Sequence, residues 1–537
     1  MIPVVARSEA SASFGVHPPE AGLRELFAPL DDLLVSGGDP RLALDHLSGC
    51  NGYGCGPSPA RQLLCFGSST ASPISERAYA RAERVREQLM HAAIGLGLDE
   101  ALDRRTEEMR HELRAHLQLP ADVEIVFSPS GTDSQLHALA LTRALLGERL
   151  TTIVVAADQT GSGTPATARG QHFNAQTATG IAVRKDTPIA GLACESMALP
   201  LSDDAEFAPR ADHAQAVLDA VKAVSARGHA AMLQIMDSSK LGWRAADQDC
   251  LDSIAQRWPG RVQLVVDACQ MRLGCRRLRA YLERGAMVLI TGSKFYGGPA
   301  FSGALLVPGM LSRALQRCCG VAEGLFDYVG RSDWPVAWTA LRARSEPRLN
   351  LGQWLRWEAA LEEIAAYHQV PDGFRAFALG ELGRAIEHRL IQSPALRPLI
   401  AEYGDADGEE FAQPTIFPVA LQRDGQLLAV EDCQQVYRAL RRDMSSVIGA
   451  NADDRAIAER RCLVGQPVRI ERSGVAPTAV LRLCIGARQV TETWNSDAAV
   501  ARDNLAREIG RLANVVAKTE LLVPHVGSLD LGRYDAV

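Results

Sequence analysis

The chain has 537 residues, of which 57 are basic and 64 acidic, so its formal net charge is −7. A domain usually takes roughly 100–200 residues, and this length therefore predicts two to four domains, or one large α/β unit with a satellite. A hydrophobic fraction of 47% and a charged fraction of 23% are typical of a globular chain and argue against a disordered or fibrous one. The negative charge and an aromatic fraction of only 5% argue against a nucleic-acid partner.

The sequence contains no recognisable membrane, targeting or metal-binding pattern. No apolar run approaches the roughly 18–20 residues of a membrane span, and residues 1–9 lack the basic start of a secretory signal. The 12 cysteines are too dilute for a disulfide scaffold, and none shows the Cys-x-x-Cys spacing of a zinc site. We therefore expect a cytoplasmic protein without a metal and without a membrane partner.

The order of patterns predicts four segments: an N-terminal extension (1–61), a large α/β domain (62–345), a smaller C-terminal α+β domain (346–518) and a tail (519–537). Short apolar runs alternate with amphipathic helices in the large domain, which predicts a mostly parallel sheet of about seven strands. Its expected strands include 123–127, 152–156, 230–235, 262–266, 287–290 and 304–307, and its expected helices are 74–117, 134–146, 212–227, 246–257 and 276–284. The first of these helices is expected to break at 95–97, with Asp99 as the N-cap of its second half. In the smaller domain we expect helices at 351–367, 374–392 and 497–517, and strands at 415–421, 468–470 and 480–485.

Three polar features follow predicted strands, where functional groups of open parallel sheets collect. Ser130-Gly131-Thr132 begins a helix, so its N–H groups and hydroxyls could bind an anion, although such residues are also ordinary helix caps. Asp267 directly follows an apolar strand, where a carboxylate is unfavourable unless it has a cation or hydrogen-bond partner. The alternative is that it caps the following turn. Lys294 follows the next strand and is flanked by small residues. It could be a desolvated amine nucleophile or an ordinary surface lysine.

Together these three features meet the needs of pyridoxal phosphate (PLP). A lysine can form a Schiff base with its aldehyde, an acid can keep its pyridine nitrogen protonated, and a helix N-terminus can hold its phosphate. No single one of the three would justify this interpretation. Their order at successive strand ends does.

The motifs resemble those of fold type I PLP-dependent enzymes, in the class V aminotransferase and cysteine desulfurase branch, over residues 62–500. The similar segments are Phe66–Pro73, Ser130-Gly131-Thr132, Asp267-Ala268-Cys269-Gln270, Thr291-Gly292-Ser293-Lys294 and Val480–Gly486. The resemblance implies the Schiff base on Lys294, Asp267 at the pyridine nitrogen and Gln270 near the ring oxygen. It further implies phosphate contacts from Ser130, Gly131, Thr132, Thr291 and Ser293. Finally, it implies Arg482 as the clamp for the substrate carboxylate and a homodimer with shared active sites.

The chain also departs from the desulfurase pattern. Ser293 stands where desulfurases usually have a histidine before the lysine, and Gln159 stands where they stack a histidine on the ring. Ser239 replaces the ring-proximal asparagine of the family. Cys462 lies 20 residues before Arg482, near the region of the reactive desulfurase cysteine, but its surroundings are typical of a strand rather than a loop.

We therefore expect a PLP-dependent transferase or lyase that acts on a small α-amino acid through an external aldimine, with an aminotransferase favoured. One alternative is a C–S or C–C lyase similar to cysteine desulfurase, with Cys462 as sulfur acceptor. The other is a non-catalytic module of the same fold, against which Lys294 argues.

Overall fold

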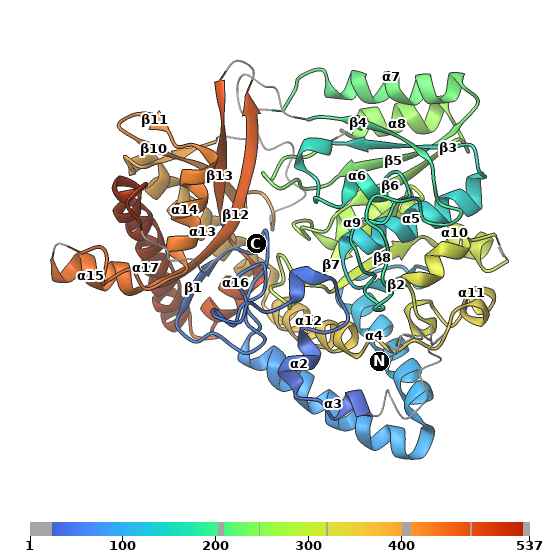
Figure 1. Ribbon diagram of the computed structural model, residues 1–537, viewed down its shortest axis with the longest axis horizontal. Coiled ribbons are helices and arrows are strands. Elements are labelled where there is room, and N and C mark those ends of the chain that lie inside the picture. Colours follow the sequence, from blue (N-terminus) through green and yellow to red (C-terminus); the bar gives the residue numbers. More distant parts are fainter. Residues whose placement is uncertain are drawn as a thin grey trace, which may run out of the picture.

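The computed structural model describes residues 24–201, 209–245, 247–317, 320–399, 410–449, 451–472 and 475–529. These residues form a mixed α/β fold with two sheets, one of seven strands and one of six (Figure 1). The segment 1–9, residue 246 at the start of an expected helix, and the last part of the expected tail (530–537) lie outside the described residues. Within the described ranges, every helix is too short or too polar to cross a membrane.

The larger sheet has the strand order β2-β8-β7-β6-β5-β3-β4. Its strands are β2 (Glu124–Ser128), β3 (Leu150–Val155), β4 (Glu195–Leu199), β5 (Ala230–Met236), β6 (Val262–Asp267), β7 (Met287–Thr291) and β8 (Gly303–Val307). The strands β7, β6, β5, β3 and β4 pair in parallel, whereas β8 pairs antiparallel with both β2 and β7. The number of strands agrees with the prediction, but the sheet is mixed. Residues 292–302 connect β7 to β8 without a helix, too short a crossover for a parallel return.

Both faces of this sheet are covered, which explains the nearly continuous apolar runs of its strands. Strands β3, β5, β7 and β8 are buried along their whole length. Around the sheet lie α5 (Gly131–Leu146), α7 (His213–Ala226), α8 (Gln248–Arg257), α9 (Cys275–Glu283) and α10 (Gly309–Leu315) (Figure 1). The helices expected here exist, with ends that differ from the prediction by at most three residues.

The second sheet gathers segments from both ends of the chain. Its strands are β1 (Leu63–Phe66), β9 (Leu396–Pro398), β10 (Ile416–Arg423), β11 (Gln426–Leu427), β12 (Arg461–Arg472) and β13 (Val475–Cys484). Strand β1 pairs in parallel with β12, and the remaining pairings are antiparallel. The sequence assigned β1 to the large domain, but this pairing makes it part of the second sheet. Helices α13 (Asp372–Gln392), α14 (Val430–Leu440), α15 (Ala452–Glu459), α16 (Ala487–Thr493) and α17 (Ala498–Leu522) surround it. Helix α17 therefore extends five residues beyond the predicted 517, into the expected tail.

Three long helices connect the sheets: α3 (Glu76–Leu96), α4 (Leu98–His116) and α12 (Leu351–Gln369). Gly97, at a φ of 80°, separates the first two and serves as the N-cap, so Asp99 lies in the first turn and is not the predicted cap. Fully buried Glu358 of α12 accepts hydrogen bonds from Arg81 (2.9 Å) of α3 and Arg105 (2.6 Å) of α4. Because a buried carboxylate needs such partners, this network fixes the three helices against one another.

The N-terminal extension is also part of the fold. Arg356 of α12 is fully buried and donates hydrogen bonds to four backbone carbonyl oxygens, three of them in the extension. These acceptors are Leu34 (3.1 Å), Ser36 (2.5 Å), Gly37 (2.9 Å) and Phe301 (2.9 Å). Burial lowers the pKa of the Arg356 guanidinium to about 9. Further along, Gln466 of β12 donates to the carbonyl oxygen of Gly52 (3.0 Å), so the extension is bound to α12 and to the second sheet.

Candidate active site

The carboxyl ends of β6 and β7 and the N-terminus of α5 meet at one edge of the larger sheet. Asp267 is the last residue of β6 and pairs with Leu289 of β7, and Thr291 is the last residue of β7. Strand β2, which precedes α5, runs in the same direction as β7 because both are antiparallel to β8. The structure thus brings the three features that the sequence singled out to the same edge.

Gly131 lies in direct contact with the residues after β6. A Cβ atom placed on Gly131 would lie 2.6 Å from Cys269 Sγ and 3.8 Å from Thr291 Cγ2. Only a glycine allows the first turn of α5 to approach the strand ends this closely. Among the described residues, the N–H groups of Gly131 and Thr132 have no hydrogen-bond partner, as expected for the first turn of a helix. These N–H groups are the available anion donors of the site.

Ser130 is the N-cap of α5, and its hydroxyl is already engaged. Ser130 Oγ accepts from the N–H of Asp133 (3.3 Å) and donates to Asp133 Oδ2 (2.5 Å). A hydroxyl has a single proton, so Ser130 cannot also donate to a phosphate while this bond exists. The backbone N–H groups of Gly131 and Thr132, rather than the Ser130 hydroxyl, are therefore available to an anion.

The sequence analysis missed Asp133 and Arg41 as components of this region. Asp133 is 2% exposed, its Oδ1 has no partner among the described residues, and burial raises its pKa to about 6. The charge of Arg41, from the N-terminal extension, acts on Asp133. Arg41 is fixed by Asp39 (2.6 Å) and stacks 4.9 Å above the ring of Phe301. Adjacency to the predicted anion cup could have indicated Asp133, whereas no local signal marks Arg41.

The candidate catalytic residues at the ends of β6 and β7 differ in whether their side chains already make hydrogen bonds within the protein. Asp267 is 8% exposed, and its Oδ1 accepts from the N–H of Cys269 (3.0 Å). Lys294 is partly buried, and neither its ammonium nor the Ser293 hydroxyl makes a hydrogen bond to a described residue. Thr291, in contrast, donates its only hydroxyl proton to the carbonyl of Cys269 (2.7 Å). Lys294 and Ser293 are therefore free for a ligand, while a phosphate contact donated by Thr291 would require this bond to break.

Gln270 and the residues after Lys294 tie the site to the second sheet. Gln270 uses one of its amide protons on the carbonyl of Ser69 (3.1 Å), in the small-residue turn 66–73. Arg272 donates to Ser68 Oγ (2.9 Å) and to the carbonyl of Ile485 (2.6 Å) and lies 5.5 Å from the ring centre of Phe295.

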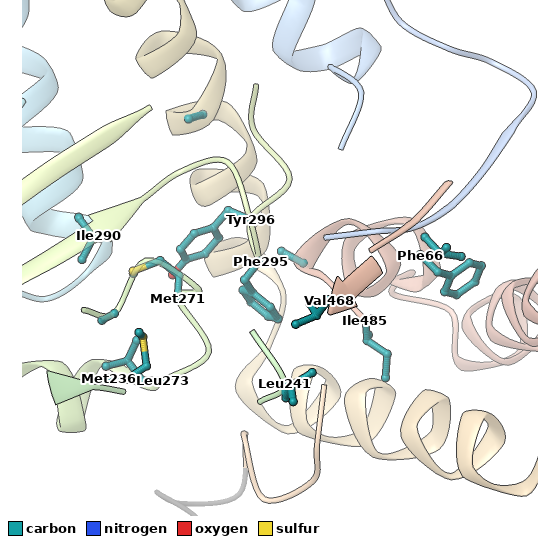
Figure 2. Close-up of a cluster of buried hydrophobic side chains, with 14 of the residues drawn as sticks. Phe66, Met236, Leu241, Met271, Leu273, Ile290, Phe295, Tyr296, Val468 and Ile485 are labelled. Atoms are coloured by element: carbon teal, nitrogen blue, oxygen red, sulfur yellow. The ribbon is translucent and has the colours of Figure 1, made fainter. Parts of the chain in front are cut away.

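Figure 2 shows Phe295 and Tyr296 between Ile290 and Met271 on one side and, on the other, Val468 of β12 and Ile485, which directly follows β13. Phe295 is fully buried, so the backbone next to Lys294 is anchored in a core shared by both sheets.

The two residues expected beside the ring contact each other. Ser239, after β5, donates a hydrogen bond to Oε1 of Gln159, which follows the neighbouring strand β3. Both side chains are buried, at 0% and 2% exposure. Two of the departures from the desulfurase pattern therefore form one linked pair, and an amide at this place does not ionise near neutral pH and cannot serve as a general acid.

Arg482, on β13, is 4% exposed and only partly engaged with the protein. Its Nη2 donates to Thr70 Oγ1 (2.9 Å) and to the carbonyl of Gln466 (2.8 Å), which also accepts from Nε (3.2 Å). Burial lowers the pKa of Arg482 from its usual value. The charges of Arg482 and Lys294 both act on Lys240, so all three cations belong to one region.

Cys462 lies in β12, as its strand-like surroundings suggested. It is fully buried opposite Leu64 of β1, and burial raises its pKa to about 11. A reactive sulfur acceptor needs an accessible thiolate, whereas the Cys462 thiol is buried and its pKa is raised.

Comparisons with known proteins add little to this geometry. No protein family matches the chain, and no curated protein sequence matches it. One solved structure that the comparison matched is described as a histidinol-phosphate aminotransferase from Erwinia carotovora atroseptica. The similarity covers 85% of this chain and all of that one, at 12% sequence identity and a TM-score of 0.43. At these values it carries no argument about the fold or the reaction.

Proposed function

We propose that this protein is a PLP-dependent enzyme of the class V aminotransferase type that transfers the amino group of an α-amino acid. The observation that carries the proposal is the convergence of Lys294, Asp267 and the first turn of α5 at one sheet edge, with Gly131 in contact with Cys269. The residues fit PLP because they offer an amine without a partner, a nearly buried carboxylate and unpaired N–H donors.

Each part of PLP has a counterpart among these residues. The N–H groups of Gly131 and Thr132 and the hydroxyl of Ser293 would hold the phosphate, and Lys294 would attach to the aldehyde. Asp267, fixed by the N–H of Cys269, would hold a proton on the pyridine nitrogen. When bound, PLP supplies an electron sink that makes the bonds at the α-carbon of an amino acid breakable.

The remaining residues position the substrate and exclude water. Arg482 presents a planar guanidinium for the α-carboxylate, and Thr70 and Gln466 fix its orientation. Gln159 and Ser239 are bonded to each other, and neither group ionises near neutral pH. Lys294, which would be released from the aldehyde when the substrate binds, would accept the proton from the α-carbon of the substrate.

The first experiment tests attachment of PLP. We expect the purified protein incubated with PLP to absorb in the visible range and to retain the label after borohydride reduction. Lys294→Ala should abolish both signals, whereas Lys222→Ala, at an exposed position of α7, should retain them. A wild-type protein that cannot be labelled, or label that persists in Lys294→Ala, would contradict the assignment.

The second experiment identifies the reaction. Wild-type enzyme is incubated with single amino acids, and keto acid, pyridoxamine phosphate and sulfide are measured. Stoichiometric keto acid and pyridoxamine phosphate would support transamination, whereas sulfide release would favour a lyase. Since Cys462 is buried, Cys462→Ala should leave the rate unchanged. We also propose a homodimer, which light scattering of the same preparation tests.

A further inference from the structure

The loop that follows β5 is a tight hairpin with Lys240 at its tip. Met236, the last residue of β5, pairs antiparallel with Ala245. Inside this pair the N–H of Ser239 donates to the carbonyl of Trp243 (2.8 Å), and that of Gly242 to the carbonyl of Ser239 (3.0 Å). Gly242 has a φ of 87°, the left-handed conformation that such three-residue loops require.

Both neighbours of Lys240 are anchored. Ser239 is fully buried and bonded to Gln159, and Leu241 is 1% exposed in the apolar cluster shown in Figure 2. The backbone of Lys240 is thus fixed on either side, although the lysine itself is only partly buried. A lysine presented in this way has a defined position, unlike a lysine on a flexible surface loop.

The surroundings of Lys240 are mainly cationic. Burial, Arg482 and Lys294 together lower its pKa to about 8, while exposed Asp158 acts in the opposite direction. Among the described residues, the Lys240 ammonium makes no hydrogen bond and no ion pair within 4 Å. Three cations near one another are unfavourable without an anion between them. The α-carboxylate of an amino acid would neutralise Arg482, and the exposed carboxylate of Asp158 would then be the anion acting on Lys240.

We propose that Lys240 binds a second carboxylate, so that the preferred substrate is an α-amino acid with an acidic side chain. This inference rests on the proposed function, since it assigns the α-carboxylate to Arg482. Met236 pairs with Asp267 of β6, and the N–H of Asp237 donates to the carbonyl of Asp267 (3.0 Å), so the hairpin lies at the same sheet edge as Asp267 and Lys294. The side chain of the substrate would then extend toward Lys240. A neutral side chain in that position would leave the ammonium desolvated, so the same residue also selects against neutral amino acids.

The test measures binding of unreactive acids by titration calorimetry of the PLP-incubated protein. Succinate and glutarate carry two carboxylates, whereas butyrate and pentanoate have the same carbon numbers and only one. Wild-type protein should bind the better diacid about 10- to 100-fold more tightly than its monoacid counterpart. Lys240→Met should reduce this preference to less than about threefold, while affinity for the monoacids changes little.

Control variants separate the roles of the cations. Lys240→Arg should keep most of the preference, and Lys222→Met should keep all of it. Arg482→Lys should weaken diacids and monoacids alike. Circular dichroism of each variant checks that it folds. No diacid preference in wild type, or an undiminished preference in Lys240→Met, would overturn the proposal.

The same samples are reduced with borohydride to measure attached PLP. Failure of labelling in wild type would refute the proposed function, and the calorimetry would still show whether Lys240 recognises a diacid. A Lys240→Met protein that loses labelling but keeps the diacid preference would assign Lys240 to the cofactor and overturn the inference.

Discussion

Replacing Gly131 by alanine tests the contact on which the site geometry depends. The new methyl group would lie 2.6 Å from Cys269 Sγ, a separation that real Cβ atoms essentially never show. Either the sulfur or the first turn of α5 must therefore move. Overpacking of this kind costs about 1–3 kcal/mol. Since α5 supplies the phosphate donors, the affinity for PLP should fall by about 5- to 150-fold.

The Cys269→Ala variant tests whether the contact with the Cys269 sulfur causes the effect of Gly131→Ala. Without the sulfur, the nearest atom of residue 269 is its Cβ at 3.8 Å from the new methyl group, an ordinary contact. Gly131→Ala should therefore be much less harmful in a Cys269→Ala background, with a coupling energy of about 1–2 kcal/mol in a double-mutant cycle. The assays are denaturant unfolding followed by circular dichroism, and titration with PLP followed by absorbance.

A matched control separates this contact from the general effect of alanine in a helix. Gly510 lies on the exposed face of α17, and a methyl group added there would have no atom within 4 Å. Gly510→Ala should therefore stabilise the protein by about 0.5–1 kcal/mol. If Gly131→Ala leaves both stability and PLP affinity unchanged, or if Cys269→Ala gives no relief, the close approach of α5 to β6 is refuted.

Buried charges lead to three further predictions. The native-state pKa of Asp133 is raised from 3.8 to about 6, so its ionisation should destabilise the fold increasingly as the pH rises from about 4 to about 6. Unfolding curves should then show Asp133→Asn gaining up to about 3 kcal/mol over wild type across this interval, and parallel pH profiles would contradict the assignment. Arg356→Met removes the donor of four backbone carbonyls and should lower the unfolding free energy by about 3 kcal/mol or more, with faster tryptic cleavage at Arg41. An unchanged digestion pattern would show that Arg356 does not hold the extension. Arg482→Lys loses the planar fork and should lower kcat/KM for amino acids by about 100-fold, and a rate within threefold of wild type would exclude Arg482 as the carboxylate clamp.

The strands of the larger sheet were predictable because they are buried on both faces and read as continuous apolar runs. Strand β4 was missed, since its residues are exposed or half-exposed and carry no such signal. The direction of β8 depends on the connection from β7, which shows no helical period in the sequence. The pairing of β1 with β12 joins segments far apart in the chain, and no local pattern encodes it.

The chemical groups of the site were similarly predictable where they are local. Lys294, Asp267 and the first turn of α5 follow strands directly, so their position at the sheet edge followed from the strand assignments. How their neighbours use their protons could not be deduced, because it depends on contacts such as that of Thr291 with the carbonyl of Cys269. The same is true of Arg41, which an otherwise irregular segment carries to Asp133.

The parallel pairing of β1 with β12 has a consequence for synthesis of the protein. Leu63 pairs with Arg461, 398 residues further along the chain (461 minus 63). At about 5–20 residues per second, a ribosome needs roughly 20–80 s to produce the partner of β1 after β1 itself. The strands of the larger sheet are all synthesised within that interval and can pair before the partner strand of β1 has been made. The second sheet, and with it the alignment of Arg482 with Thr70, therefore forms only as synthesis approaches its end.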